Sequence, residues 1–110
     1  MENELLQNES MLPNGWTVWT IQGRIDIVTA DEVGRQGEKI TARNDKTVLD
    51  MSGVQYISSA GLRVLLRILK KAKKEGKEFT VAGATGTVKM VLEDSNMDTL
   101  LEMRESLAEL

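Results

Sequence analysis

The chain of 110 residues contains neither histidine nor cysteine. Histidine is the commonest general base near neutral pH, so a Ser-His-Asp triad cannot be built from this chain alone. The absence of cysteine excludes disulfides and thiolate chemistry, and the two absences together exclude zinc sites of the usual kind. Carboxylates and lysines remain available for catalysis, but the composition favours a protein that is not an enzyme and uses no cofactor or metal.

The sequence also lacks long apolar runs and a strong net charge. No segment approaches the roughly 20 apolar residues that span a membrane, and the first ten residues, MENELLQNES, lack the basic start and apolar run of a signal peptide. A net charge of −3 argues against general nucleic-acid binding. The cluster KKAKKEGK has no aromatic residue for base stacking and is typical of a solvated helix end. We therefore expect a cytoplasmic protein with no membrane partner and no direct nucleic-acid partner.

Proline is scarce, and its one occurrence marks a turn. Pro13 begins a Pro-Asn-Gly turn, which predicts a hairpin between a weak strand at residues 5–12 and a stronger one at residues 16–22. Aromatic and β-branched residues alternate on both sides of the second strand, so we expect it to be covered on both faces, at least in part. Gly23 is expected to end this strand.

The first helix is predicted from its start signal. Thr29, followed three residues later by Glu32, fits a capping box and predicts a helix over residues 30–42. Gly34 and Gly37 weaken such a helix relative to alanine. We expect close approach to the sheet to be the reason for glycine at these two positions.

The remaining chain alternates between strand and helix patterns. We expect a strand at 47–51, a turn within 52–57, a helix at 60–75 closed by Gly76, a strand at 79–82, a helix at 87–93, a last strand within 97–103 and a final helical turn within 104–110. This order predicts a single domain, residues 1–110, of the α/β class, in which helices pack against a mixed sheet.

The predicted helix at 60–75 has a wide apolar side. Its hydrophobic residues span about 200° of the helix surface, more than the stripe of about 100° with which a surface helix faces a core. These residues are Leu62, Val64, Leu65, Leu66, Ile68, Leu69 and Ala72. Two interpretations stay open: the helix is set deeply in the core, or the flank beside the preceding serines is exposed and binds a partner.

The stretch YISSAGL, residues 56–62, places two serines directly before this helix. A serine at such a position commonly caps the helix by accepting a hydrogen bond from a free backbone amide. A nucleophilic serine needs an activating base, and ISSAG is not the G-x-S-x-G nucleophile elbow. Phosphorylation is the third interpretation, since a helix N-terminus tolerates an anion and the modification would alter the surface more than the fold.

Three segments carry a family resemblance: IQGRIDIVTADEV, VLDMSGVQYISSAGLRVLL and VAGATGTVKMVLEDSNMDTL. With them the chain, from about Trp16 onward, resembles the STAS domain family and, within it, the stand-alone bacterial anti-sigma factor antagonists. The resemblance implies a mixed sheet of four to five strands with three to four helices packed against it. It also implies that the unphosphorylated protein binds an anti-sigma factor serine/threonine kinase and frees the sigma factor. Phosphorylation by this kinase ends the binding, and a phosphatase restores it.

The resemblance assigns the phosphorylated residue to Ser59, with Ser58 as the second choice. The alignment rests on Gly61 and Leu62, and Ser58 stands where many members have Asp. Asp26 matches the family's acidic residue near the acceptor serine. Either it shapes the kinase-docking surface or it is a turn carboxylate before the first helix. The expected partner-binding surface comprises Asp26, Ile27, Ile57, Ser58, Ala60, Gly61 and Leu62.

Two other functions stay open. STAS-like domains also serve as adaptor subunits of transporters and stress-signalling complexes, where binding does not depend on a phosphate. A nucleotide-binding or hydrolytic protein is a rival of another class, because Gly83 and Gly86 in AGATGT superficially suggest a phosphate loop. That stretch lacks the G-x-x-x-x-G-K-[ST] pattern, so we expect a binding protein.

Overall fold

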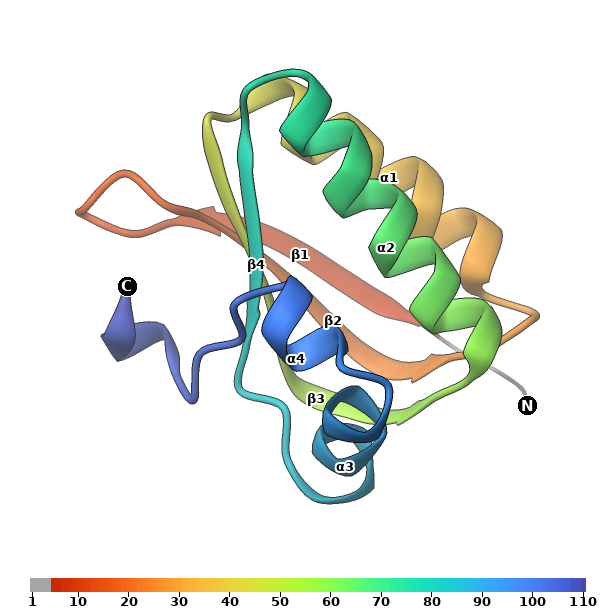
Figure 1. Ribbon diagram of the computed structural model, residues 1–110. Coiled ribbons are helices and arrows are strands. Elements are labelled where there is room, and N and C mark those ends of the chain that lie inside the picture. Colours follow the sequence, from red (N-terminus) through yellow and green to blue (C-terminus); the bar gives the residue numbers. More distant parts are fainter. Residues whose placement is uncertain (1–4) are drawn as a thin grey trace.

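The computed structural model describes residues 5–110 and folds them into a four-stranded mixed sheet with helices against it (Figure 1). The strands are β1 (Leu6–Met11), β2 (Thr17–Ile25), β3 (Lys46–Ile57) and β4 (Glu78–Ala82), in this spatial order. The hairpin strands β1 and β2 are antiparallel, whereas β3 runs parallel to both of its neighbours. The absence of a signal peptide was expected from residues 1–10, and the first four of these lie outside the described residues.

The first three helices follow the expected order, whereas the fourth stands where a strand was expected. The helices are α1 (Ala30–Arg43), α2 (Ser59–Lys74), α3 (Gly86–Asp94) and α4 (Met97–Leu100), with a 3-10 turn, η1 (Leu107–Glu109), near the end. Figure 1 shows α1 and α2 side by side along one face of the sheet, with α3 and α4 beyond the lower part of that face. The predicted α/β class with a mixed sheet is therefore confirmed.

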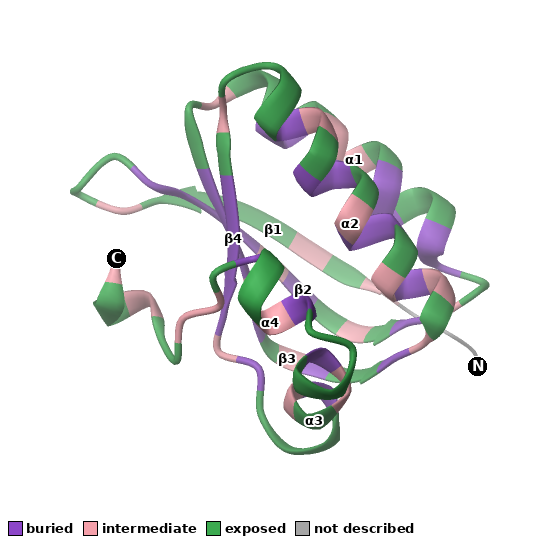
Figure 2. Cartoon of the chain, viewed as in Figure 1, coloured by how far each residue is buried: buried purple, intermediate pink, exposed green. Residues whose placement is uncertain are grey.

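The main core lies between the sheet and its helices. Trp19, Leu49 and Val81 are neighbours in register across the three parallel strands, and all three are fully buried. The buried side of α2, which includes Leu65 and Ile68, belongs to the same core. Figure 2 shows the buried residues of α1 and α2 on the sides turned toward the sheet.

A second, smaller core lies on the opposite face of the sheet. Trp16, Val18, Val48 and Ala82 are buried there, with Leu12, Leu107 and Leu110 packed against them. The turn η1 therefore covers part of this face. Because Trp19 of β2 belongs to the main core and Val18 of the same strand to the smaller one, β2 is covered on both faces, as predicted.

The two glycines of α1 permit close packing, each against different neighbours. A Cβ atom on Gly37 would lie 2.7 Å from the Trp19 ring of β2 and would also collide with Ile68 of α2. This glycine meets the expectation of close approach to the sheet. A Cβ atom on Gly34 would instead meet the guanidinium of Arg67, so Gly34 faces α2 and not the sheet.

Two predicted strand boundaries are wrong. Gly23 does not end β2, which continues to Ile25 with Gly23 at φ 124°. The strand predicted at 47–51 extends to Ile57 instead of turning within 52–57. Both strands continue because they pair with each other. Two register shifts, between Thr20 and Gln22 and between Gly23 and Arg24, accommodate extra residues in β3.

The capping box at Thr29 is also wrong. Thr29 occupies the N-cap position of α1, but its side chain makes no capping hydrogen bond. Its hydroxyl donates to Arg24 O at 2.8 Å and accepts from Asp26 N at 3.0 Å. The side chain thus turns back toward the preceding loop, which it helps to fold.

The C-terminal cap of α2 at Gly76 is as predicted, whereas the last predicted strand is not present. Gly76 adopts φ 74°, and the amides of Gly76 and Lys77 donate to the carbonyls of Lys73 and Ala72, a Schellman C-cap. The segment 97–103 contains α4 in place of a strand, because Met97 and Leu101, four residues apart, both enter the main core. The final helical turn is present in the short form of η1.

Candidate functional site

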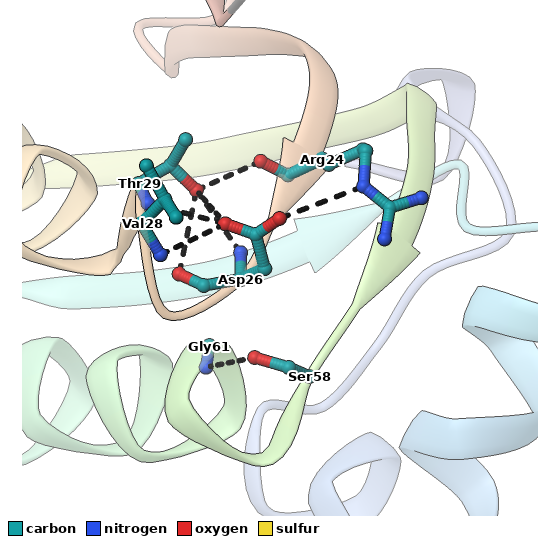
Figure 3. Close-up of polar contacts among 6 residues, drawn as sticks. All are labelled: Arg24, Asp26, Val28, Thr29, Ser58 and Gly61. Atoms are coloured by element: carbon teal, nitrogen blue, oxygen red, sulfur yellow. Dashed lines mark hydrogen bonds and ion pairs between the residues drawn. The ribbon is translucent and has the colours of Figure 1, made fainter. Parts of the chain in front are cut away.

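Ser58 is held in place at the junction between β3 and α2. It has an extended conformation (φ −95°, ψ 175°), and its hydroxyl accepts a hydrogen bond from Gly61 N at 3.3 Å (Figure 3). Its own amide donates to Ile25 O at 2.9 Å, which ties the start of α2 to the end of β2. Ser58 is therefore the N-cap of α2, the first of the roles considered for the serine pair.

Ser59 is the first residue of α2, and its side chain is exposed. Its hydroxyl makes no hydrogen bond to any residue between 5 and 110, so it is open to a reagent from solvent. The first turn of α2 contains no acidic residue. The helix dipole and the free amides at this position favour an anion, so a phosphate on Ser59 is compatible with the fold.

Asp26 folds the loop between β2 and α1. Its Oδ1 accepts hydrogen bonds from Val28 N at 3.0 Å and Thr29 N at 3.2 Å (Figure 3). Its carbonyl accepts from Ala30 N at 2.8 Å. These contacts are those of a turn carboxylate, one of the two roles expected for Asp26.

The electrostatics of Asp26 favour its ionised form. Arg24 Nε lies 3.5 Å from Asp26 Oδ2, and only 13% of the Asp26 side chain is exposed. Burial opposes ionisation, but the amides of Thr29 and Val28 and the Arg24 guanidinium outweigh it, so the pKa of Asp26 lies below its usual value. A carboxylate with a low pKa and occupied oxygens is a poor general base for a serine hydroxyl.

An apolar surface surrounds the exposed serine. Ile27 and Val28, at the tip of the loop, are 79% and 67% exposed. The hydrogen bond between Ser58 and Ile25 keeps this loop beside the start of α2. Ala60 and Leu62 are half-buried. Exposed aliphatic side chains gathered at one end of a domain are typical of a protein-binding surface.

Two residues of the expected surface lie beneath it. Ile57 and Gly61 are buried, so they cannot touch a partner directly. A Cβ atom on Gly61 would lie 2.8 Å from the side chains of Ile25 and Ile57 and 2.9 Å from Ile25 O. Gly61 thus lets the first turn of α2 approach the ends of β2 and β3, and both Ile57 and Gly61 lie beneath the surface that was predicted to bind a partner.

The wide apolar side of α2 combines a core and a flank. Val64, Leu65 and Ile68 are among the buried residues of this helix, whereas Leu62 and Leu66 are only half-buried. The inner part of the predicted arc therefore faces the core. The outer part, beside Ser59, contributes to the surface, so the two interpretations of the sequence apply to different parts of the arc.

The sequence analysis missed three residues of this region. Val28 extends the exposed loop tip, and the Arg24 guanidinium lies 4.2 Å from the centre of the Tyr56 ring, where it makes a cation–π contact. Arg24 and Tyr56 are cross-strand neighbours only because of the register shifts in β3. In the sequence, the only sign of this contact was that an arginine and a tyrosine each lie near the end of a strand.

The described part of the chain offers no metal-binding group and no membrane helix. Among residues 5–110 there is no cluster of three or more Asp or Glu side chains placed to hold a metal ion. No helix in the same range has the length and apolar character needed to cross a membrane.

Comparison with known proteins identifies the family. Residues 8–110 match the STAS domain, and the chain belongs to this family. Anti-sigma-F factor antagonist RsfB of Mycobacterium tuberculosis is 32% identical over 75 residues, which are 67% of this chain and 62% of that protein. The match thus spans less than two thirds of the length of this relative.

Solved structures share the fold. An anti-sigma factor antagonist from Mycobacterium paratuberculosis superposes with a TM-score of 0.87 at 23% identity, covering 99% of this chain and 92% of that one. A sulfate transporter family protein from Wolinella succinogenes superposes with a TM-score of 0.75 at 18% identity, covering 90% and 84%. The STAS-like fold implied by the sequence resemblance is confirmed.

Proposed function

We propose that this protein is an anti-sigma factor antagonist controlled by phosphorylation of Ser59. Its unphosphorylated form binds an anti-sigma factor serine kinase and so releases the sigma factor, and the phosphorylated form no longer binds. The carrying observation is the difference between the serines: Ser58 is engaged as the helix cap, while Ser59 is exposed. The protein is then a substrate of the kinase and not an enzyme, it acts in the cytoplasm, and a phosphatase regenerates it.

The proposed contact surface centres on Ser59. Ile27, Ala60 and Leu62 supply its apolar area, and Asp26 supports it by holding the loop that presents Ile27. Ser58 contributes from the edge of the helix cap. Ile57 and Gly61 support the surface from beneath. Burial of a side chain as exposed as Ile27 against a partner would contribute roughly 1.5–3 kcal/mol.

A phosphate at this place would oppose binding without unfolding the protein. It adds a charge of about −1.5 to −2 at neutral pH. A partner that covers Ile27 and Leu62 would have to remove water from this charge, which is strongly unfavourable unless a cation meets it. The domain itself tolerates the phosphate, because the start of a helix favours an anion.

The names of similar proteins support this proposal. The M. tuberculosis relative is named an anti-sigma-F factor antagonist, and its match at 32% identity covers two thirds of this chain. The M. paratuberculosis structure carries the same kind of name, and its likeness extends over nearly the whole chain. The capping role of Ser58 and the exposure of Ser59 are observed in the structure and do not depend on either name.

Phosphorylation by a candidate kinase is the direct test. The protein would be incubated with ATP and a histidine-kinase-like ATPase encoded beside its gene, and the phosphorylated residue would be mapped by mass spectrometry. We expect one phosphate, on Ser59. The variant Ser59→Ala should abolish labelling, whereas Ser58→Ala should destabilise the protein by about 1 kcal/mol through loss of the cap and still accept phosphate.

Binding measurements separate the switch from a passive contact. Ser59→Asp should weaken kinase binding at least tenfold. Ser10→Asp is the matched control that should leave it unchanged, because Ser10 is an exposed serine of β1 whose side chain makes no hydrogen bond within residues 5–110. Labelling of neither Ser59 nor Ser58 would overturn the phosphorylation switch. Mapping to Ser58 alone would move the switch to the capping residue.

A constitutive adaptor is the second candidate. The sulfate transporter family protein from W. succinogenes has a similar fold, which favours considering an adaptor subunit of a transporter or stress-signalling complex. An adaptor should bind its partner equally well as wild type and as Ser59→Asp. Equal affinities would favour the adaptor over the antagonist.

A further inference from the structure

Positive charge is concentrated on α2. This helix contains six basic residues and no acidic one, in a chain whose net charge is −3. The basic residues are Arg63, Arg67, Lys70, Lys71, Lys73 and Lys74. Lysines in the last turns complement the negative end of the helix dipole, so their placement needs no further explanation.

Arg63 is not explained in the same way. It lies in the second turn of α2, far from the last turn, where the dipole would favour a cation. Its neighbour Arg67 is bonded to Glu38 at 3.1 Å, whereas Arg63 is exposed and forms no ion pair within the part of the chain that the structure describes. Neither helix electrostatics nor a salt bridge accounts for a cation at this position.

The position of Arg63 relative to Ser59 offers a reason. Ser59 and Arg63 are four residues apart in one helix and are both exposed, so they are neighbours on its outer surface. Side chains at this spacing have Cβ atoms about 5–6 Å apart, and a negative group placed N-terminal to a positive one is the favourable orientation. The guanidinium also presents paired donors that match phosphate oxygens.

We propose that Arg63 binds the phosphate carried by Ser59 and holds it along the outer face of α2. This inference rests on the proposed function only for the choice of Ser59 as the modified residue. The phosphate then changes the partner-binding surface in two ways: it adds negative charge beside Leu62, and it withdraws the Arg63 guanidinium from any acidic group of the partner.

Genetically encoded phosphoserine tests the contact without a kinase. Protein carrying phosphoserine at position 59 would be titrated by ³¹P NMR between pH 4 and pH 8, alone and with Arg63→Gln. Because the guanidinium stabilises the dianion, we expect the second pKa of the phosphate to rise by about 0.2–0.4 in Arg63→Gln. In 1 M NaCl, where charges are screened within about 3 Å, this difference should shrink.

Lys70→Gln is the matched control, since it removes one positive charge from the same face of α2. Lys70 is eleven residues from Ser59, about 16 Å along the helix axis and beyond the screening length of about 8 Å at physiological salt. We expect it to leave the phosphate pKa unchanged within about 0.1, with circular dichroism showing that each variant is folded. An unchanged pKa in Arg63→Gln, or an equal rise in Lys70→Gln, would overturn the inference. A failed kinase assay would not affect this titration, so the two proposals fail separately.

Discussion

Two adjacent hydroxyl groups at the start of α2 differ in what holds them. The Ser58 hydroxyl and amide both make hydrogen bonds, to Gly61 and Ile25, whereas the Ser59 hydroxyl points to solvent. A kinase can reach Ser59 with the domain folded. To reach Ser58 it would first have to break the cap, at a cost of about 1 kcal/mol. If the proposed phosphorylation occurs, we therefore expect Ser58 to be the poorer substrate.

Asp26 is expected to make stability depend on pH. Its folded-state pKa is lowered, so its carboxylate stabilises the fold above the unfolded pKa of about 4, and this contribution is lost as pH falls through the folded-state value. Asp26→Asn should therefore reduce the free energy of unfolding at pH 7 by about 1 kcal/mol. At pH 3 the difference from wild type should be smaller, as measured by urea denaturation at both pH values.

Asp31→Asn is the comparison variant, since Asp31 is exposed in the first turn of α1, five residues away. Its effect should stay within about 0.5 kcal/mol at both pH values. Equal destabilisation by Asp26→Asn at pH 7 and pH 3 would contradict the role assigned to the ionised carboxylate.

At the scale of elements, helices were predicted more accurately than strands. The start of α1 was predicted from Thr29, which does occupy the N-cap position although it makes no capping hydrogen bond, and the end of α2 was predicted from Gly76; both are local signals. The true length of β3 is not local, because its residues 52–57 are held by pairing with β2 through two register shifts. The same shifts decide that Tyr56 meets Arg24, so this part of the site could not be predicted from the sequence.

Gly61→Ala tests the close approach of α2 to the sheet. Alanine is favoured over glycine within a helix by about 1 kcal/mol, but its Cβ would collide with Ile25, including the backbone oxygen, and with Ile57. We expect a net loss of about 1–3 kcal/mol in the free energy of unfolding, measured by chemical denaturation.

Gly34→Ala is the matched control in α1. The atoms nearest to its added methyl group belong to the end of the flexible Arg67 side chain, which can move aside. This variant should be neutral or slightly stabilised. A Gly61→Ala protein as stable as Gly34→Ala would show that the start of α2 can shift away from the sheet.

At the scale of the whole molecule, the sequence predicted the alternation of strands and helices and the mixed sheet. It did not predict the structure of the last segment of the chain. The segment 97–103 was expected to add a strand, but it forms α4 and then follows the edge of β4. Whether apolar residues at the end of a chain pair as a strand or pack as a helix depends on the space left by the rest of the fold. Met97 and Leu101 fill that space in the main core.

Shortening the chain after Arg104 tests the smaller core. It removes Leu107 and Leu110, which pack on the face of the sheet that contains Trp16. We expect the tryptophan fluorescence maximum to shift to longer wavelength and the free energy of unfolding to fall by about 1–3 kcal/mol. Adding Trp16→Phe to the shortened chain should abolish the shift, because Trp19 stays buried in the main core. An unchanged emission maximum would contradict this packing.

The edge of β4 is covered by residues that are synthesised after the strand itself, and this order has a consequence for a newly made chain. Arg104 N donates to Val81 O, and Gly83 N donates to Arg104 O, so residues near 104 occupy the outer edge of β4. Until this segment has docked, a newly synthesised domain presents an uncovered strand edge to neighbouring chains. Crowded expression should therefore favour aggregation of chains in which this segment has not yet docked.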